Sequence, residues 1–309
     1  MMRVLDSLAQ TIADLLQADD ARVLLGEDVA DGGMLGLSRV CLETADLAAR
    51  LLSTPLVPAA GIAHAAGLAA AGLKPIFILP SAAAIMEGYG ALREVVYLHQ
   101  QGHLPGQMVL LAPYGAGFGL RSRSSDALEA ALCALAGLRV VCLGQANQAK
   151  ALVEAAVNFS VSEQPTVILL PRLLLLQEEV QTDELASSLA HADVLSRGEE
   201  ATVFAWGAAV EQAKQAIAQS QIKAGLVDVR SLAPLDISTL VNAAQQTGKL
   251  VIVQTSHSGY GPGAELAAIF TEHAILQLDA PILRVTCNAE NAELSIQEIA
   301  LAIHQVANY

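Results

Sequence analysis

The chain has 309 residues, of which 53% are hydrophobic and only 16% are charged, and its formal net charge at pH 7 is -14. This length and apolar content are sufficient for about two domains, each with a full hydrophobic core. The acidic charge excludes nucleic acid and anionic membranes as partners, because both would repel such a surface, and the scarcity of charged residues indicates burial against other chains.

Apolar runs alternate with helix-like segments in the first half of the chain, which is the pattern of a mostly parallel sheet covered by helices. Strands are predicted at residues 22–25, 76–79, 108–112, 139–143 and 166–170. Helices are predicted at residues 60–71, 83–100, 126–136 and 147–158. The first domain is therefore expected to span residues 1–176.

A polar segment at residues 177–200 follows and is predicted to be a linker. Beyond it, strands are predicted at residues 202–205, 225–229, 249–253 and 282–285, with helices between them and a last helix near residues 295–306. The second domain is expected to span residues 201–309. The predicted fold class is thus α/β with two domains, each a mostly parallel sheet covered by helices.

No targeting or membrane segment is expected. Residues 1–17 form an amphipathic pattern carrying Asp6 and Asp14, unlike a basic region followed by an apolar run. Residues 51–73 lack charge over a length that could span a bilayer, but their prolines, glycines and many alanines predict a closely packed helix at a subunit interface instead. The four cysteines show no metal-ligand spacing and are predicted to be small buried side chains in a reducing cytoplasm.

Three local patterns bear on chemistry. The Ser-His-Ser run at residues 256–258 lacks a surrounding nucleophile elbow, so a serine hydrolase is not indicated. The glycines of residues 115–119 are not followed by Lys-Ser or Lys-Thr, as a phosphate-binding P-loop would require. Glu27 follows a predicted strand, the usual place for ligand-binding residues in open α/β sheets, and is a candidate for lining a cleft.

Motifs along nearly the whole chain match one known family. Residues 53–75 read Ser-Thr-Pro-Leu-Val-Pro, then a run rich in alanine and glycine, then Ala-Gly-Leu-Lys-Pro. Further matches are RVLLGEDVADGG at 22–33, LAPYGAGFG at 111–119, GLRVVCL at 137–143, VDVRSLAPLDISTL at 227–240 and LDAPILRVT at 278–286. Through these motifs the chain resembles the beta subunit of the thiamin-diphosphate-dependent 2-oxo acid dehydrogenases, which act on pyruvate and branched-chain 2-oxo acids.

The resemblance implies a fold, a cofactor and partners. The first domain would be of the transketolase-like pyrimidine-binding type, and the second of the transketolase C-terminal type. Thiamin diphosphate and magnesium would lie at a subunit interface, with the diphosphate and metal ligands on a separate alpha-type subunit. The chain would pair with a second copy of itself in an α2β2 heterotetramer, and a lipoyl-carrying acyltransferase would be a further partner.

The family's activating groups are missing at the matching positions. The family has a Glu that hydrogen-bonds the cofactor's aminopyrimidine and favours the tautomer that takes the thiazolium proton. Pro58 stands in its place and carries neither an acid nor a backbone N–H. The segment that ends in Ser81 and Ala82 replaces one that ends in an aromatic residue stacked on the pyrimidine ring.

Ser124 occupies the position of the family's substrate-channel His, with Arg121 and Arg123 close by in the sequence. Two roles are open for the arginines: solvated or interface charges, or a bidentate grip on an anionic ligand. The Asp-containing loop that supports a structural potassium ion in many family members is replaced by residues 158–164, which contain no Asp. The resemblance therefore does not extend to a potassium site.

Three functions remain open at this point. The first is an enzyme that decarboxylates a 2-oxo acid and transfers the acyl group, or performs a related carboligation, without the family's Glu. The second is a catalytically silent pseudoenzyme subunit that stabilises or regulates a partner. The third is a binding protein for another anionic ligand in the vacated cleft, for which the two arginines are the only hint.

Overall fold

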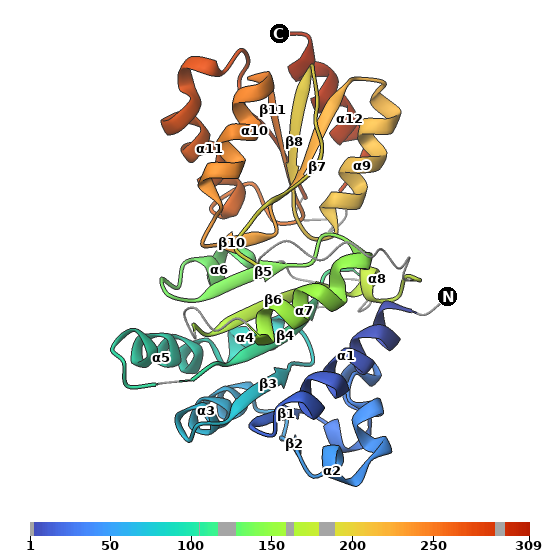
Figure 1. The fold of residues 1–309 in the computed structure, drawn as a ribbon. Helices are drawn as coiled ribbons and strands as arrows, with labels where there is room; N and C mark the ends of the chain where they lie inside the picture. The colour runs from blue at the N-terminus through green and yellow to red at the C-terminus, as the bar shows by residue number, and fades with distance from the viewer. Residues whose placement is uncertain (1–2, 105, 117–127, 159–163, 179–188, 288–293) are drawn as a thin grey trace.

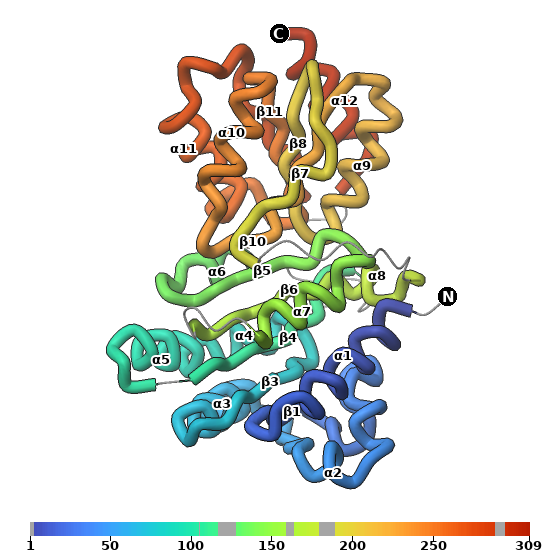
Figure 2. Tube along the Cα trace, viewed as in Figure 1, coloured from blue at the N-terminus to red at the C-terminus, as the bar shows by residue number. Residues whose placement is uncertain are grey.

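The computed structural model describes residues 3–104, 106–116, 128–158, 164–178, 189–287 and 294–309. Two sheets build two stacked units (Figure 1). The amino-terminal end of the chain lies beside the first unit, and the C-terminus lies at the far end of the second (Figure 2). The predicted α/β class with two helix-covered sheets is confirmed.

The first sheet has seven strands in the order β10-β5-β6-β4-β3-β1-β2. Neighbouring strands run parallel except β10 and β5, which are antiparallel. Its central strands are buried along their whole length, as is typical of a parallel sheet covered on both faces. The strands are β1 (Arg22–Gly26), β2 (Leu51–Ser53), β3 (Lys74–Ile78), β4 (Val109–Tyr114), β5 (Arg139–Cys142), β6 (Thr166–Pro171) and β10 (Ser231–Ala233).

Helices pack on both faces of this sheet. On one face, α1 (Val4–Ala18) packs against α7 (Ala149–Asn158), and both share an apolar core with the strands. On the other face, α3 (Pro58–Ala70) packs against α5 (Tyr89–Gln100). Shorter elements are α2 (Ala45–Ala48), α4 (Ala83–Glu87), α6 (Glu129–Cys133), α8 (Arg172–Leu175), η1 (Val29–Asp31), η2 (Met34–Gly36), η3 (Arg39–Glu43) and η5 (Ala146–Gln148).

The helix predicted at residues 83–100 is two helices, α4 and α5, which meet at Gly88. A Cβ atom on Gly88 would lie 2.7 Å from Ile62 Cδ1 and 3.1 Å from the backbone carbonyl carbon of Pro58. Gly88 therefore packs directly against the start of α3, and this close approach requires glycine. The start of α3 is fixed by the contact.

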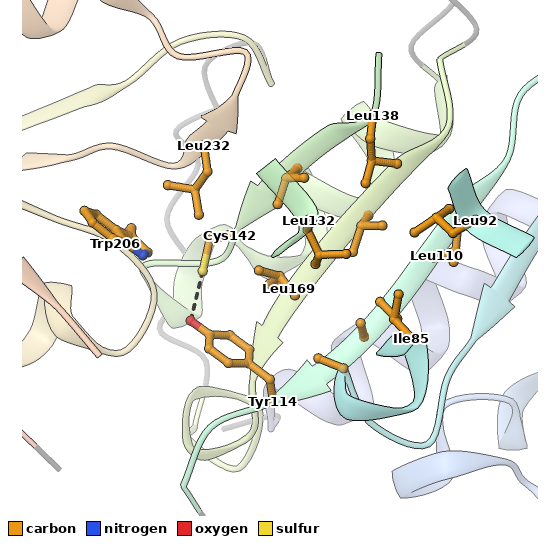
Figure 3. Close-up of a cluster of buried hydrophobic side chains, with 14 of the residues drawn as sticks. Ile85, Leu92, Leu110, Tyr114, Leu132, Leu138, Cys142, Leu169, Trp206 and Leu232 are labelled. Carbon is orange, nitrogen blue, oxygen red and sulfur yellow. Dashed lines mark hydrogen bonds between the residues drawn. The ribbon is translucent and has the colours of Figure 1, made fainter. Parts of the chain in front are cut away.

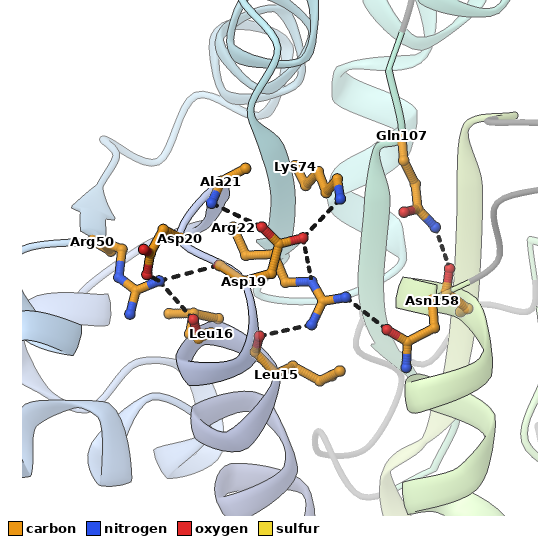
Figure 4. A network of polar contacts seen from close by, with 11 residues as sticks. Leu15, Leu16, Asp19, Asp20, Ala21, Arg22, Arg50, Lys74, Gln107 and Asn158 are labelled. Atoms are coloured by element: carbon orange, nitrogen blue, oxygen red, sulfur yellow. Dashed lines mark hydrogen bonds and ion pairs between the residues drawn. The ribbon is translucent and has the colours of Figure 1, made fainter.

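A polar network closes the amino-terminal edge of the first sheet (Figure 4). Arg22, at the start of β1, donates to the Leu15 carbonyl at 2.7 Å and to Asn158 Oδ1 at 2.6 Å, so it ties α1 to the end of α7. Asp19 accepts from Lys74 Nζ at 2.7 Å, at the start of β3. These contacts hold the strand starts together, and the candidate site lies at the opposite edge.

The second sheet has five strands in the order β12-β11-β8-β9-β7, all parallel except β7, which is antiparallel to β9. One pair of helices, α9 and α12, covers one face, and α10 and α11 cover the other (Figure 1). The elements are β7 (Asp193–Ser196), β8 (Ala201–Ala205), β9 (Ala224–Asp228), β11 (Leu250–Gln254), β12 (Leu283–Thr286), α9 (Ala209–Ser220), α10 (Ile237–Thr247), α11 (Pro262–Ala274), η6 (Ile275–Gln277) and α12 (Ile296–Ala307).

The two units are less separate than the sequence predicts. β7 lies within the predicted linker 177–200 and pairs with β9. Its side chains are half-buried or exposed, because it is an edge strand, so the sequence there is polar enough to resemble a linker. β10 follows β9 in the chain but joins the first sheet, where Ser231 pairs with Val141 of β5. Neither sheet is therefore confined to the predicted ranges 1–176 and 201–309.

Within the described ranges, no helix has both the length and the hydropathy needed to cross a bilayer. Residues 51–73, uncharged in the sequence, form β2, a turn and all of α3. All four cysteines are free thiols, and three of them, Cys41, Cys142 and Cys287, are buried. The fourth, Cys133, is partly buried.

Asp236 caps α10 and connects it to the chain before β7. Its Oδ1 accepts the Thr239 N–H at 3.2 Å and the Ser238 hydroxyl at 2.9 Å, and its Oδ2 accepts the Ala192 N–H at 3.1 Å. Burial favours the protonated form, but hydrogen bonds from Thr239, Ser238 and His191 outweigh it and hold the pKa of Asp236 at about 2. Its contribution to stability is therefore complete above the ordinary pKa of 3.8 and is lost as the pH falls towards about 2.

The Asp236→Ala substitution is expected to lower the free energy of unfolding by about 1–2 kcal/mol at neutral pH, measured by urea denaturation, because the cap and the Ala192 contact are lost together. Ser295→Ala is the matched control, since among the described residues the Ser295 hydroxyl accepts one hydrogen bond, from the N–H of Glu298 at the start of α12. A loss at Asp236 no greater than that at Ser295 would contradict the double role of Asp236.

Candidate functional site

Three parallel strands end side by side at the carboxyl edge of the first sheet. Gly26, the last residue of β1, pairs in register with Ser53 of β2 and Ile78 of β3. The Thr54 N–H donates to the Gly26 carbonyl at 2.9 Å, so the chain that enters α3 runs beside the end of β1. Ligands of open α/β sheets bind at such an edge. The predicted candidates that follow these strands are Glu27, Pro58, Ser81 and Ala82.

Glu27 directly follows β1 and is half-buried, whereas Asp28 beside it is exposed. Burial, with a smaller effect from the negative charge of Asp28, raises the pKa of Glu27 above its ordinary value. The turn after it is closed by the Asp31 and Gly33 N–H groups, which both donate to the Asp28 carbonyl at 2.8 Å. Glu27 thus keeps its proton to higher pH than an exposed Glu does.

Pro58 is the first residue of α3 and is buried. Proline suits this position, because its fixed φ is helical and the N–H that it lacks would have no partner in the helix. The first turn of α3 contains no acidic residue, and residues 53–75 contain no Asp or Glu. The described part of this segment therefore offers no acid where the family places one.

Ser81 and Ala82 lie between β3 and α4 and belong to the interior. Ala82 is fully buried, and its N–H donates to the Pro113 carbonyl of β4 at 2.7 Å. Ser81 is 6% exposed, and its carbonyl accepts the Ala84 N–H at 3.1 Å. A methyl group inside the core thus stands where the resemblance implies an aromatic face. Pro58 and Ala82 thus supply neither the acid nor the aromatic face that the resemblance implies for contact with an aminopyrimidine ring.

Three predicted candidates, Arg121, Arg123 and Ser124, lie outside the described residues. The described chain on the amino side of them ends at Ala116, just after β4. β4 lies beside β3, so this attachment point is at the same carboxyl edge as Ala82. The structure brings Glu27, Pro58, Ser81 and Ala82 to one edge, and it gives no positions for the arginines or the serine.

Sequence reasoning missed a set of buried charged residues between the two units. Glu129 on α6 and Asp228 at the end of β9 are 0% exposed, and Arg230 is 1% exposed. Charged residues are almost never fully buried unless they are paired. A signal was available in the sequence: Glu129 is the only charged residue in the run Leu128–Leu132, and Asp228 and Arg230 directly follow an apolar strand.

Comparison with known proteins identifies the two units. Residues 1–177 match the family model described as the transketolase pyrimidine binding domain, and residues 190–303 match the transketolase C-terminal domain. The solved structure titled "Split gene transketolase, inactive beta4 tetramer" superposes with a TM-score of 0.80, at 20% identity, over 99% of this chain and 98% of that chain. A transketolase from Leishmania mexicana superposes with a TM-score of 0.71, at 18% identity, over 99% of this chain and 46% of that chain.

Curated relatives cover nearly the whole chain. The pyruvate dehydrogenase E1 component subunit beta of Acholeplasma laidlawii is 30% identical over 303 residues, covering 93% of this chain and 89% of the relative. The 2-oxoisovalerate dehydrogenase subunit beta of Bacillus subtilis is 29% identical over 297 residues, covering 92% and 89%. With both family models matched in order, the chain belongs to the family of beta subunits of thiamin-diphosphate-dependent 2-oxo acid dehydrogenases.

Proposed function

We propose that this chain is a beta-type subunit of an α2β2 assembly that acts on pyruvate or a branched-chain 2-oxo acid, and that its own half of the active site lacks the acid that activates the cofactor. The observation that carries the proposal is the buried Pro58 at the start of α3, in a segment without Asp or Glu. General acid–base help is worth about 10²–10⁴-fold in rate, so its loss changes the mechanism. In the proposal, the diphosphate and magnesium ligands belong to the alpha-type partner.

The packing around α3 supports an impaired site. Gly88 lies directly against Pro58 and Ile62, so the start of the helix is closely packed where the acid is missing. The buried Ala82 offers no aromatic surface at its own position, where the resemblance implies one for stacking on the pyrimidine. In this proposal the chain completes and stabilises the assembly, and cofactor activation is slow.

The alternative is an enzyme that works without an acid at residue 58. The observation that favours it is the half-buried Glu27 with its raised pKa, at the same strand edge. A carboxyl group that titrates above its ordinary range is a common feature of active sites. The third possibility, a binding protein for another anion, rests on Arg121 and Arg123, which lie outside the described residues.

The surface beside Pro58 supports contact with partner subunits. Leu56 and Val57, in the turn before α3, are 65% and 49% exposed, and Met86 on α4 is 44% exposed. His64 is exposed on α3, among alanines and glycines that allow a second helix to approach closely. We propose that this surface meets the alpha-type subunit and the second copy of the chain. A lipoyl-carrying acyltransferase is the further partner of the assembly, and the cytoplasm is its compartment.

The proposed assembly can be tested by co-expression with the alpha-type subunit of the same organism, followed by sedimentation and by assay of retained thiamin diphosphate and magnesium. We expect an α2β2 particle with weakly retained cofactor, and an oligomer of the chain when it is expressed alone. A monodisperse monomer at micromolar concentration that recovers no alpha-type partner would contradict the proposal.

A matched pair of variants locates the contact. Leu56→Asp is expected to weaken assembly with the alpha-type subunit, because it places a charge in the proposed interface. Leu276→Asp makes the same change at a leucine that is 91% exposed on the second unit, after α11, and is expected to leave assembly intact. Equal effects of the two variants would argue against an interface beside Pro58.

A further inference from the structure

At the junction between the two units, polar side chains of each unit pack directly against a glycine of the other unit. In the first unit, the Tyr114 hydroxyl at the end of β4 lies 3.0 Å from the Cys142 thiol at the end of β5 (Figure 3). Gly207, which follows β8 in the second unit, covers this pair. A Cβ atom on Gly207 would lie 2.1 Å from the Tyr114 hydroxyl and 2.9 Å from the Cys142 sulfur. A side chain at residue 207 would therefore separate the units.

The reverse arrangement holds at Asp228. Its carboxylate, at the end of β9, is 0% exposed and lies under Gly144 of the first unit, where a Cβ atom would come within 2.4 Å of Oδ2. The Arg230 N–H donates to Asp228 Oδ1 at 3.1 Å, and the Arg230 guanidinium lies 3.9 Å from Oδ2. That guanidinium is shared, since it also donates to Asp193 of β7 at 2.8 Å and to Gln148 of the first unit. The Arg230 guanidinium therefore compensates the charge of Asp228 only in part.

Glu129 is a second buried carboxyl at this junction. It is 0% exposed, and neither of its side-chain oxygens reaches a hydrogen-bond partner among the described residues. The indole of Trp206, which follows β8 in the second unit, and the Glu129 backbone N–H lie close enough to lower the pKa of Glu129, but burial outweighs both. A charged carboxylate in this setting is therefore poorly compensated for its desolvation, whereas a protonated carboxyl avoids most of that cost.

Other titratable groups face these two carboxyls. Tyr114 and Cys142 lie near both of them, and burial keeps the pKa of the Tyr114 hydroxyl and of the Cys142 thiol well above their ordinary values, so both stay neutral. The elements packed around Glu129 carry Cys133 on α6, Arg139 on β5, and Glu265, Glu272 and His273 on α11, of which the three on α11 are exposed. The groups around Asp228 are Asp193 and Arg230, Glu211 and Lys214 on α9, and, next to β7, His191, whose Nδ1 lies 3.1 Å from Asp236 Oδ2.

We propose that contact between the two units is coupled to proton binding at Glu129 and Asp228. Both carboxyls are protonated when this junction is closed, and both ionise when the units separate. The ratio of closed to open forms then increases as the pH falls and decreases as the pH rises. This inference concerns the packing between the units, and it holds whether or not the first unit activates a cofactor.

The direction follows from the two carboxyls. Burial, only partly offset by Arg230, raises the pKa of Asp228 from its ordinary 3.8 to about 7, and burial also raises the pKa of Glu129. At a pH between the pKa of a carboxyl in the open junction and its pKa in the closed one, the closed junction binds one more proton at that group. One such proton changes the ratio of closed to open forms by about tenfold per pH unit. For Asp228 alone this is about a hundredfold between about pH 5 and about pH 7, and no further change above that.

Trp206 provides a direct probe, because it is the only tryptophan of the chain and is fully buried at the junction. Acrylamide quenching and the emission maximum of the full-length chain should be measured between about pH 5 and about pH 8. We expect quenching to increase and the emission to shift to longer wavelength as the pH rises. Because ionisation of Glu129 alone alters the surroundings of the indole, a second readout is needed. Hydrogen exchange at the Cys142 N–H, which donates at 2.8 Å to the carbonyl of Arg230, the residue before β10, supplies it.

Variants of the two carboxyls complete the test. The double variant Glu129→Gln and Asp228→Asn keeps the shape of both side chains, and Arg230 keeps Asp193, so we expect a folded protein whose junction stays closed at about pH 8. Glu129→Gln alone breaks no ion pair. It should make the pH dependence shallower, because only the proton bound by Asp228 then contributes. His191→Gln should leave the profile unchanged.

Three results would overturn the inference. They are a wild-type profile that is flat in both readouts, a Glu129→Gln profile identical to the wild type, and a profile that disappears with His191→Gln. Failure of the subunit to bind thiamin diphosphate or its partner would bear on the proposed function and not on this result.

Discussion

Replacing Arg230 by Met is expected to lower the free energy of unfolding of the chain by about 3 kcal/mol, the lower end of the range for removing one partner of a buried ion pair. The Arg230 side chain is 1% exposed and holds Asp193 of the second unit and Gln148 of the first. Methionine fills a similar volume and, like arginine, carries a Cβ atom at this left-handed position with φ 53°. The substitution therefore isolates the loss of the cation. Asp228 can then take up a proton, which limits the cost.

Urea denaturation at about pH 7, followed by circular dichroism, measures this loss. Arg39→Met is the matched control, because the Arg39 guanidinium pairs with Asp6 on the surface, where the two side chains are 48% and 33% exposed. Such a pair contributes under about 1 kcal/mol. Similar losses for the two variants would show that the Arg230 network does not hold the units together.

The fold was largely predictable, because fully buried parallel strands leave apolar runs in the sequence. The strands predicted at residues 22–25 and 166–170 are β1 and β6, within one residue at each end. The three strands that escaped prediction, β2, β7 and β10, are all edge strands. β7 is polar and β10 has three residues, and β10 is placed by pairing with β5, a long-range contact that no local pattern encodes.

The candidate site divides in the same way. Motif matching could place Pro58 at a helix start and Glu27 at a strand end, and both lie there. It could not show that Ala82 is enclosed in the core, because burial depends on the neighbouring strand that its N–H meets. It also passed over Glu129, since a single acid in a helix is normally on the surface, whereas this one is fully buried.

Restoring the acid alone is expected to have little effect. Pro58→Glu supplies a carboxylate at the first helical position, where the helix dipole favours it. The aromatic surface remains absent at Ala82, and the ring would be misplaced, which at about 1 Å can cost on the order of 10²-fold in rate. Pro58→Gln is the matched control, because it has the same shape without the acid. We expect the two variants to differ by less than about tenfold in cofactor activation, far below the 10²–10⁴-fold that a well-placed acid contributes.

The most direct measurement is hydrogen–deuterium exchange at the thiazolium carbon of thiamin diphosphate, in the complete assembly of this chain and its alpha-type partner with saturating cofactor and magnesium. We expect the wild-type assembly to exchange no faster than the free cofactor, because the described edge of this chain carries Pro58 in place of an acid. Exchange faster than the free cofactor by about 10²-fold or more would contradict the impaired site and establish an enzyme that works without an acid at residue 58.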